Sequence, residues 1–198
     1  MRPTQVLLER VRDEWGRVLR HPFPRRLAAG VGAAGFREWL GLEAALAEAM
    51  AGLVAPVVPK APKPHRYVLA QALLFLVEEA EWLETQARGR PPLPEATARL
   101  ARLRPAPRTE WKRVATEFWL GGSAYFHALR AVRPEDEWVR AYWERRTSAI
   151  IAAFLHDFAE LADLALARYP GAAAVPHARR VLAGLAGFWD LGLGLLGG

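Results

Sequence analysis

The chain has 198 residues, 52% of them hydrophobic, no cysteine and a formal net charge of +6. The length and apolar content predict a single globular domain over residues 1–198 and exclude a disordered chain, while the lack of cysteine excludes disulfides, thiolate nucleophiles and cysteine metal sites. The basic residues are mostly arginines, scattered in pairs such as Arg25-Arg26 and interleaved with acidic residues, so we predict no nucleic-acid partner.

Helical periodicity dominates the first half of the chain. An apolar stripe over residues 6–19 predicts a helix that stops at the HPFP sequence of residues 21–24, because proline lacks an N–H and clashes with the preceding turn. Strong helix formers predict a second helix over 33–54, and the four prolines of residues 55–65 predict a stiff connector. A third helix is predicted over 67–87. Its first half, residues 67–77, is apolar on more than one face, which predicts a central position.

The second half continues in the same pattern. A short helix is predicted over 94–103, and Thr109 is a candidate N-cap for a helix that reaches residue 132. Residues 135–168 form the longest helical pattern, for which we expect a bend, and a last helix is predicted over 176–196. Alternating β-branched runs and hairpin dipeptides are missing. The sequence therefore predicts an all-α, single-domain bundle of about seven helices.

Two features indicate the compartment. The first residues, MRPTQVLLERVRDEW, are charged and amphipathic and lack the apolar core of a signal sequence. No apolar run approaches the roughly 18 residues that a membrane span needs. We therefore expect a cytoplasmic protein without a membrane partner.

Residues 119–129, WLGGSAYFHAL, are unusual for a helix interior. Each of the two adjacent glycines costs roughly 1 kcal/mol relative to alanine. Ser123, Tyr125 and His127 follow, and His127 lies one helical turn after Ser123, where it is a candidate general base for a serine nucleophile. The stretch is thus a candidate functional segment.

Buried carboxylates are further candidates. Glu43 in WLGLEAAL and Asp190 in GFWDLGL both have apolar neighbours, and a carboxylate on an apolar helix face must find a partner or stay protonated. Such a group serves either as a ligand anchor or as part of a structural hydrogen bond or salt bridge. The acidic run Glu78, Glu79, Glu81 and Glu84 is typical of a solvated helix face.

The eight tryptophans fit either core packing or an aromatic-lined pocket for a flat ligand. The five histidines lie on different segments, and neither H-E-x-x-H nor paired Glu-x-x-His motifs occur. We predict no metal site and no cofactor.

Four segments, in this order, resemble the TenA/thiaminase II family. They are Trp15 followed by HPF at residues 21–23, then GFREWLGLEAAL, EWVRAYW at residues 137–143, and GFWDLG. The resemblance covers most of the chain and implies the haem-oxygenase-like helical fold. It also implies a homo-oligomer, because dimers and tetramers are common in the family.

The family's enzymes hydrolyse thiamin or its aminopyrimidine breakdown products, and hold the flat pyrimidine between aromatic rings. An acidic residue grips the amino edge, a cysteine attacks and a glutamate moves protons. Carried over by motif, the acidic anchor falls on Glu43, and the aromatic positions fall on Trp39, Tyr142 and Phe188. The glutamate falls on Leu185, which cannot move a proton.

The family's cysteine segment is most similar to residues 119–127. This alignment puts Ser123 at the cysteine, Tyr125 at a tryptophan and His127 at a tyrosine. A neutral serine is a weaker nucleophile than a thiolate and needs an adjacent base. The resemblance therefore implies a divergent member that lacks the catalytic cysteine and glutamate, with the glycines leaving room beside a pocket-lining helix.

The sequence favours a TenA-like protein with a central pocket for a flat heteroaromatic small molecule, such as a thiamin-related pyrimidine of thiamin metabolism or salvage. Glu43 is the predicted anchor, and the predicted lining residues are Trp39, Tyr125, Tyr142 and Phe188. Catalysis is left open; a hydrolase of this type would use Ser123 and His127. The alternative is a non-catalytic oligomeric helical scaffold whose ancestral pocket is filled.

Overall fold

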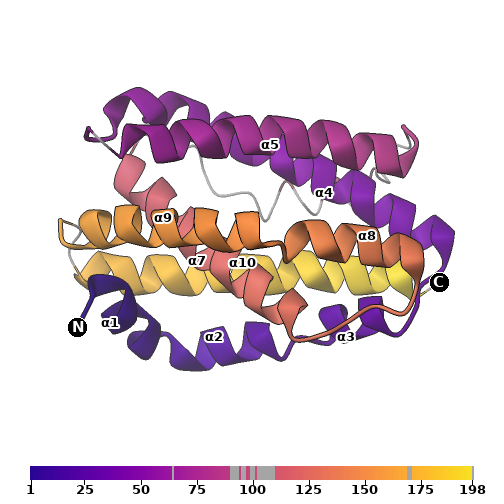
Figure 1. Cartoon of the computed structure of the whole chain (residues 1–198). Helices are drawn as coiled ribbons and strands as arrows, with labels where there is room; N and C mark the ends of the chain where they lie inside the picture. The colour runs from indigo at the N-terminus through magenta and orange to yellow at the C-terminus, as the bar shows by residue number, and fades with distance from the viewer. Residues whose placement is uncertain are drawn as a thin grey trace. The chain divides into compact units, whose positions relative to one another are not determined.

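The computed structural model describes residues 1–63, 65–89, 94, 97–98, 101, 110–168 and 171–197. Most of these residues are helical, and none of them lies in a strand (Figure 1). The chain divides into two compact units. The first comprises Met1–Gly30 and Lys112–Trp189, and the second comprises Val31–Trp111 and Asp190–Gly198. The all-α class predicted from the sequence is confirmed.

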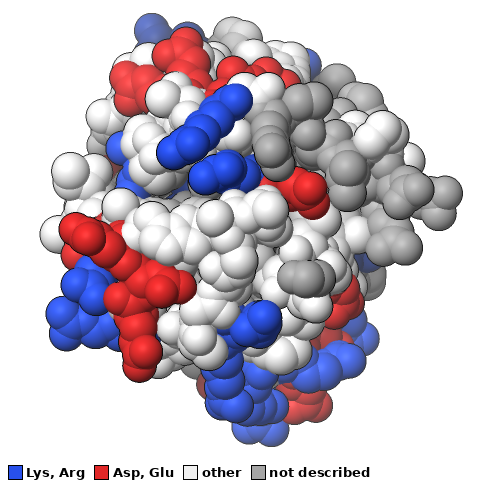
Figure 2. All heavy atoms as spheres, turned by 90° about the vertical axis from the view of Figure 1, so that its right-hand side faces the viewer, with Lys and Arg blue, Asp and Glu red and all other residues white. Residues whose placement is uncertain are grey.

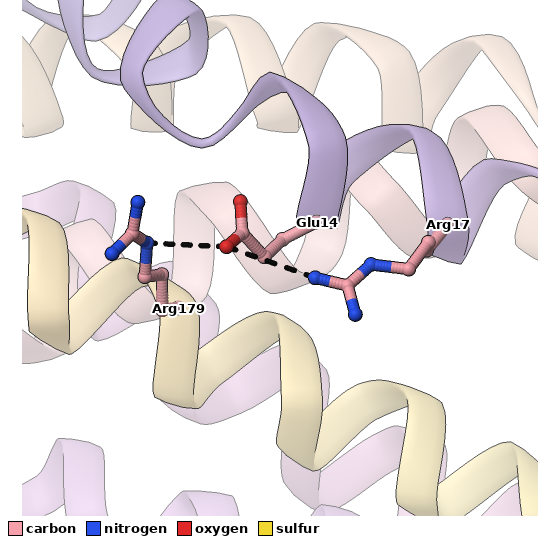
Figure 3. A network of polar contacts seen from close by, with 3 residues as sticks. All are labelled: Glu14, Arg17 and Arg179. Carbon is pink, nitrogen blue, oxygen red and sulfur yellow. Dashed lines mark ion pairs between the residues drawn. The ribbon is translucent and has the colours of Figure 1, made fainter.

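The first unit contains three short N-terminal helices and most of the C-terminal half of the chain. Its helices are α1 (Pro3–Arg10), α2 (Arg12–Leu19), α3 (Pro22–Ala28), α7 (Trp111–Arg130), α8 (Glu137–Arg146), α9 (Ala149–Leu166) and the greater part of α10 (Gly171–Leu196). Two polar contacts tie the N-terminal helices to this unit. The backbone N–H of Thr4 donates to Asp163 Oδ1 on α9 over 2.8 Å, and Glu14 on α2 forms an ion pair with Arg179 on α10 over 3.1 Å (Figure 3).

The HPFP sequence begins a helix as well as ending one. His21 is the N-cap of α3, and its Nδ1 accepts a hydrogen bond from the backbone N–H of Phe23 over 3.3 Å. Pro22 is the first residue of α3, where a missing N–H costs nothing because the first turn has no intrahelical acceptor. The sequence pattern missed this helix, and it also missed the break at Val11 between α1 and α2.

The long pattern over residues 135–168 forms two helices. α8 ends at Arg146, and the Ser148 hydroxyl oxygen accepts a hydrogen bond from the N–H of Ile151, which caps α9. The expected bend is therefore a break with its own N-cap, which satisfies a free N–H of the new helix. α10 begins at Gly171, earlier than predicted, with Pro176 inside the helix.

The second unit is built around two long helices. α4 (Ala33–Val54) packs against α5 (Arg66–Ala87), and the 3-10 helix η1 (Ala55–Lys60) lies in the connector between them. α5 ends at Arg88 and Gly89, which both have positive φ, and the N–H of Gly89 donates to the carbonyl of Glu84 over 3.1 Å. This is a helix stop that favours glycine. The predicted helix over 94–103 lies largely outside the described residues, as does Thr109.

The segment Ala33–Lys60 is long and apolar enough to cross a membrane. One 18-residue window has a mean hydropathy of 1.5, and 39% of that window is buried. The segment contains Arg37, Glu38, Glu43 and Glu48, so it is not an uninterrupted apolar run of that length. A core helix passes the same test, and α4 buries apolar residues along its length, among them Phe36, Trp39, Leu40 and Leu42.

The glycine pair in α7 serves helix packing. A Cβ added at Gly122 would lie 2.9 Å from Leu155 Cδ2 of α9, and one added at Gly121 would lie 3.6 Å from Val181 Cγ1 of α10. Neither glycine faces open space, so they do not leave room beside a pocket. Gly122 lets α7 approach α9 within the first unit, which accounts for its cost in helix propensity, whereas a Cβ at Gly121 would make only ordinary van der Waals contact.

The two glycines predict different responses to alanine. Gly121→Ala meets only ordinary van der Waals contact, so its helix-propensity gain of about 1 kcal/mol should raise Tm by about 2–4 °C. Gly122→Ala should give a smaller rise or none, because Leu155 must move. Thermal unfolding by circular dichroism measures both variants. In a Leu155→Ala background the Gly122→Ala gain should return; equal rises for both glycines in the native background would contradict this packing account.

Candidate functional site

A cluster of aromatic side chains surrounds Trp189 in the first unit. The Trp189 ring stacks on Phe23 at a centroid distance of 5.9 Å and an interplanar angle of 16°. The ring centroids of His21 and Tyr125 lie 5.5 Å and 5.4 Å from that of Trp189, with interplanar angles of 51° and 49°. The Tyr125 hydroxyl forms a hydrogen bond with the hydroxyl of Tyr142. We call His21, Phe23, Tyr125, Tyr142 and Trp189 the aromatic cluster.

Four helices position the aromatic cluster. His21 and Phe23 are fixed by the cap of α3, because Nδ1 of His21 accepts a hydrogen bond from the Phe23 N–H. Tyr125 comes from α7 and Tyr142 from α8, where the Arg146 guanidinium lies 5.4 Å above the Tyr142 ring. Such a cation–π contact holds the ring in place. Segments far apart in sequence thus converge on one tryptophan.

The aromatic cluster has a buried side and a partly exposed side. Phe23, Tyr142 and Trp189 are at most 1% exposed, whereas His21 and Tyr125 are partly exposed. The indole Nε1 of Trp189 is buried and has no hydrogen-bond partner in the part of the chain that the structure describes. A buried donor left unsatisfied costs about 1–3 kcal/mol. An acceptor atom supplied from outside the chain, such as a ring nitrogen or a carbonyl oxygen, would remove that cost.

Among the predicted site residues, the structure brings Tyr125 and Tyr142 together. Phe188, the predicted stacking residue, is buried at 3% exposure and precedes Trp189 on α10. The sequence reasoning missed Trp189, His21 and Phe23 as members of a cluster. Their signal was present in the HPF and GFWDLG motifs, but spacing alone does not show that the two segments meet.

Ser123 and His127 are not joined by a hydrogen bond within the described part of the chain. Ser123 is 9% exposed on α7. The exposed His127 packs its ring edge to face with Trp15, at a centroid distance of 6.3 Å and an interplanar angle of 67°. Partial burial of the imidazole, and secondly the positive charge of Arg130, lower the pKa of His127 below its ordinary 6.5. His127 is therefore neutral near pH 7, the protonation state that a general base requires.

Glu43 and Trp39 belong to the second unit, on α4. Glu43 is 4% exposed and Trp39 is fully buried. Burial of the carboxylate agrees with its apolar sequence neighbours. Asp190 has apolar neighbours too but is exposed, so sequence context alone did not distinguish the two.

The acidic run on α5 is not uniformly solvated. Glu78, Glu81 and Glu84 are exposed as expected, but Glu79 is only 1% exposed. Glu79 lies with Leu76 and Leu83 on the buried side of α5, because residues three and four apart share one face of a helix. The second unit therefore buries two carboxylates, Glu43 and Glu79, on two helices that pack against each other.

Neither the surface charge nor the metal-ligating side chains of the described residues indicate a second candidate site. On the face shown in Figure 2, lysine and arginine side chains are interspersed with acidic and neutral ones and form no continuous basic surface. No group of three or more metal-ligating side chains occurs among the described residues. The aromatic cluster is thus the most developed candidate site in the first unit.

Comparison with known proteins identifies the fold. No family model matches the chain, and no curated protein matches it. The solved structures of TenA homologues do. A TenA homologue from Pyrococcus furiosus matches with a TM-score of 0.75 and 18% identity, covering 96% of this chain and 99% of that one. The TenA homologue protein from P. horikoshii OT3 matches with a TM-score of 0.72 and 14% identity, covering 98% and 100%.

The chain has the fold of the TenA homologues. The haem-oxygenase-like all-α fold that the sequence resemblance implied is confirmed. At this level of identity the likeness concerns the fold, and the roles of individual residues stay predictions.

The lowered pKa of His127 predicts a pH-dependent contribution to stability. The unfolded chain takes up a proton near pH 6.5, whereas folded His127 resists it, so stability is complete above pH 6.5 and is lost as the pH falls through the folded-state pKa. The Tm difference between the native chain and His127→Gln should therefore shrink between pH 7.5 and pH 5. Proton NMR titration checks the cause: Arg130→Gln should raise the pKa of His127, and an ordinary value in the native chain would contradict the prediction.

Proposed function

We propose that this is a TenA-like cytoplasmic protein that binds a flat heteroaromatic small molecule, a thiamin-related pyrimidine, in thiamin metabolism or salvage. The shared fold over nearly the whole chain supports the family. The sequence motifs that resemble TenA support the ligand class, since they supply an acidic residue and several aromatic side chains at matching positions.

One observation carries the proposal: in the aromatic cluster, the buried Nε1–H of Trp189 has no hydrogen-bond acceptor among the described residues. A flat ring stacks on aromatic faces, and the cluster offers the partly exposed rings of His21 and Tyr125. A pyrimidine nitrogen is a hydrogen-bond acceptor, and the Trp189 Nε1–H lacks an acceptor within the described residues. The tyrosine hydroxyl pair adds a group that donates or accepts. These properties favour a heteroaromatic ring over a purely apolar ligand.

The proposed roles follow from the resemblance. Glu43 would grip the exocyclic amino group, because a carboxylate accepts hydrogen bonds from an amino-pyrimidine edge. Trp39, Phe188, Tyr125 and Tyr142 would line the ligand. Burial of Glu43 supports this role, since a buried carboxylate interacts more strongly with a donor than a solvated one does.

Turnover is the secondary part of the proposal. Hydrolysis would need Ser123 as nucleophile and His127 as base, and these two side chains would have to come within hydrogen-bond distance. Ligand binding needs no such rearrangement of α7. We therefore propose binding as the function, with serine-dependent hydrolysis as an outcome of the test.

A scaffold without a ligand is the second candidate. The near-complete burial of Phe23, Tyr142 and Trp189 favours it, because packed side chains occupy space that a pocket would need. In that case the aromatic cluster is a hydrophobic core that stabilises the first unit.

Thermal unfolding with a ligand panel separates the two candidates. The panel contains thiamin, its phosphates, hydroxymethyl- and aminomethyl-pyrimidines and haem. A ligand at 100 times its Kd adds about 2.7 kcal/mol of stability, which should raise Tm by about 5–10 °C for a chain of this size. We expect a shift with pyrimidines. A shift with haem alone, or with no compound, would overturn the proposed ligand class.

Tyr125→Phe tests whether the aromatic cluster is the binding site. It removes one hydroxyl and keeps the ring, so the pyrimidine-induced Tm shift should fall by about a third, since a lost hydrogen bond of about 1 kcal/mol reduces a ligand stabilisation of about 2.7 kcal/mol. Trp138→Phe is the matched control, since Trp138 is 40% exposed on α8 and outside the cluster. Equal losses in both variants would argue against the cluster.

Two variants separate binding from turnover. Glu43→Gln should abolish the ligand-induced shift, because the neutral amide replaces an acceptor-only anchor with a mixed donor and acceptor. Ser123→Ala should keep the shift and lose any pyrimidine hydrolysis, measured by product chromatography. A ligand shift that survives Glu43→Gln would remove Glu43 from the site, and hydrolysis that survives Ser123→Ala would exclude serine as the nucleophile.

A further inference from the structure

The last turn of α10 packs directly on the first turn of α4, within the second unit. A Cβ added at Gly35 would lie 2.2 Å from the carbonyl oxygen of Leu195 and 3.2 Å from its carbonyl carbon. Both distances are shorter than van der Waals contact. Because both atoms belong to the backbone, no side-chain rotation could relieve the overlap. Any other residue at position 35 therefore requires α10 and α4 to move apart.

The two helix ends that meet here are electrostatically complementary. The N-cap of α4 is Gly32, which has no side chain to accept a hydrogen bond, and no acidic residue stands in the first turn. The first four N–H groups of a helix have no intrahelical acceptor, and the last four carbonyls have no intrahelical donor. Gly35 belongs to the first set in α4 and Leu195 to the second set in α10. The negative end of one helix dipole thus lies at the positive end of another, which is favourable.

The face of α4 that receives α10 also carries two of the proposed ligand residues. Gly35, Trp39 and Glu43 follow one another in steps of four, which places them on one side of the helix. Trp39 is fully buried and Glu43 is 4% exposed. α4 is one helix from Ala33 to Val54, and Glu43 lies about 12 Å along its axis from Gly35. A tilt or rotation of α4 forced at Gly35 is therefore carried to both side chains.

We propose that the contact of Gly35 with the Leu195 carbonyl, which we call the α4–α10 contact, holds α4 in the orientation that positions Glu43 and Trp39 for the ligand. Gly35 is thus a positioning residue, which acts through α4. The buried Leu196, 1% exposed, anchors the other partner, because moving the last turn of α10 would expose its side chain. The positioning role rests on the proposed function, whereas the α4–α10 contact itself does not.

Alanine substitution tests the α4–α10 contact, with Gly52→Ala as the matched control on the same helix. A Cβ at Gly52 would meet nothing within 4 Å, so Gly52→Ala gains helix propensity and should raise Tm by about 2–4 °C. Gly35→Ala gains the same propensity, yet it should lower Tm because the backbone of α10 must move. Equal rises in the two variants would exclude the contact.

Amide hydrogen exchange locates the effect of the substitution. In Gly35→Ala, the amides of residues 36–43 and 190–196 should exchange at least about tenfold faster than in the native chain, because the two helix ends open locally. In Gly52→Ala, the same amides should exchange at the native rate. Native exchange rates in Gly35→Ala would show that the α4–α10 contact does not hold the two helices.

Equilibrium binding of the hydroxymethyl- and aminomethyl-pyrimidines separates positioning from stability. At a temperature where far-ultraviolet circular dichroism shows every variant folded, Gly35→Ala should raise Kd at least about tenfold. Val54→Ala is the destabilised control, since Val54 is fully buried at the other end of α4. It should lower Tm by leaving a cavity and keep Kd within about twofold of the native value. A native Kd in Gly35→Ala, or an equal rise in Val54→Ala, would remove Gly35 as a positioning residue.

Failure of this proposal and failure of the proposed function give different results. If the native chain binds neither pyrimidine, the proposed function is wrong and the positioning role of Gly35 is wrong with it, while the exchange rates still decide the α4–α10 contact. If the native chain binds a pyrimidine and Gly35→Ala binds it equally well, the positioning role alone is wrong.

Discussion

The close approach of α7 to its neighbours is the constraint on which the first unit depends. At Gly122 the missing side chain leaves room for Leu155 of α9, which an added Cβ would approach to 2.9 Å. A side chain larger than alanine there would push α7 away from α9, since packed interiors leave no spare volume. Tyr125, one turn further along α7, would then be displaced from Trp189 on α10. The helix propensity that glycine costs in α7 is thus offset by closer packing between helices.

The aromatic cluster combines close packing with an unsatisfied hydrogen-bond donor. Its rings are packed as in a hydrophobic core, yet Trp189 keeps a buried donor with no partner among the described residues. In a core optimised for stability alone, phenylalanine at this position would avoid the cost of the unsatisfied N–H. The tryptophan and the tyrosine hydroxyl pair are compatible with the proposed recognition of a polar, flat ring. This is why the cluster carries the functional proposal more strongly than the total number of tryptophans does.

The second unit shows how one helix serves two surfaces. α5 buries one apolar face within its unit and presents another to solvent, with charges of opposite sign toward its ends. Its register also decides the state of its carboxylates, because Glu79 is buried while Glu78, Glu81 and Glu84 are exposed.

The sequence by itself determined the fold class and most of the helices. Apolar periodicity is a local property, and it predicted α4, α5 and α7 with ends close to those observed. Local caps and proline effects, such as the start of α3 at Pro22 and the break before α9 at Ser148, are also encoded in short segments, but the competing pattern of a longer helix hid them.

Tertiary structure alone decided which side chains are buried and which meet. Glu43 and Asp190 have similar apolar neighbours in sequence, yet the first is buried and the second is exposed. His127 follows Ser123 by one turn, but its ring lies against Trp15 rather than forming a hydrogen bond with the serine. The members of the aromatic cluster are far apart in the sequence, from His21 near the N-terminus to Trp189 on α10. Burial and contact of such residues depend on how helices that are distant in sequence pack together, and a local sequence pattern carries no information about distant neighbours.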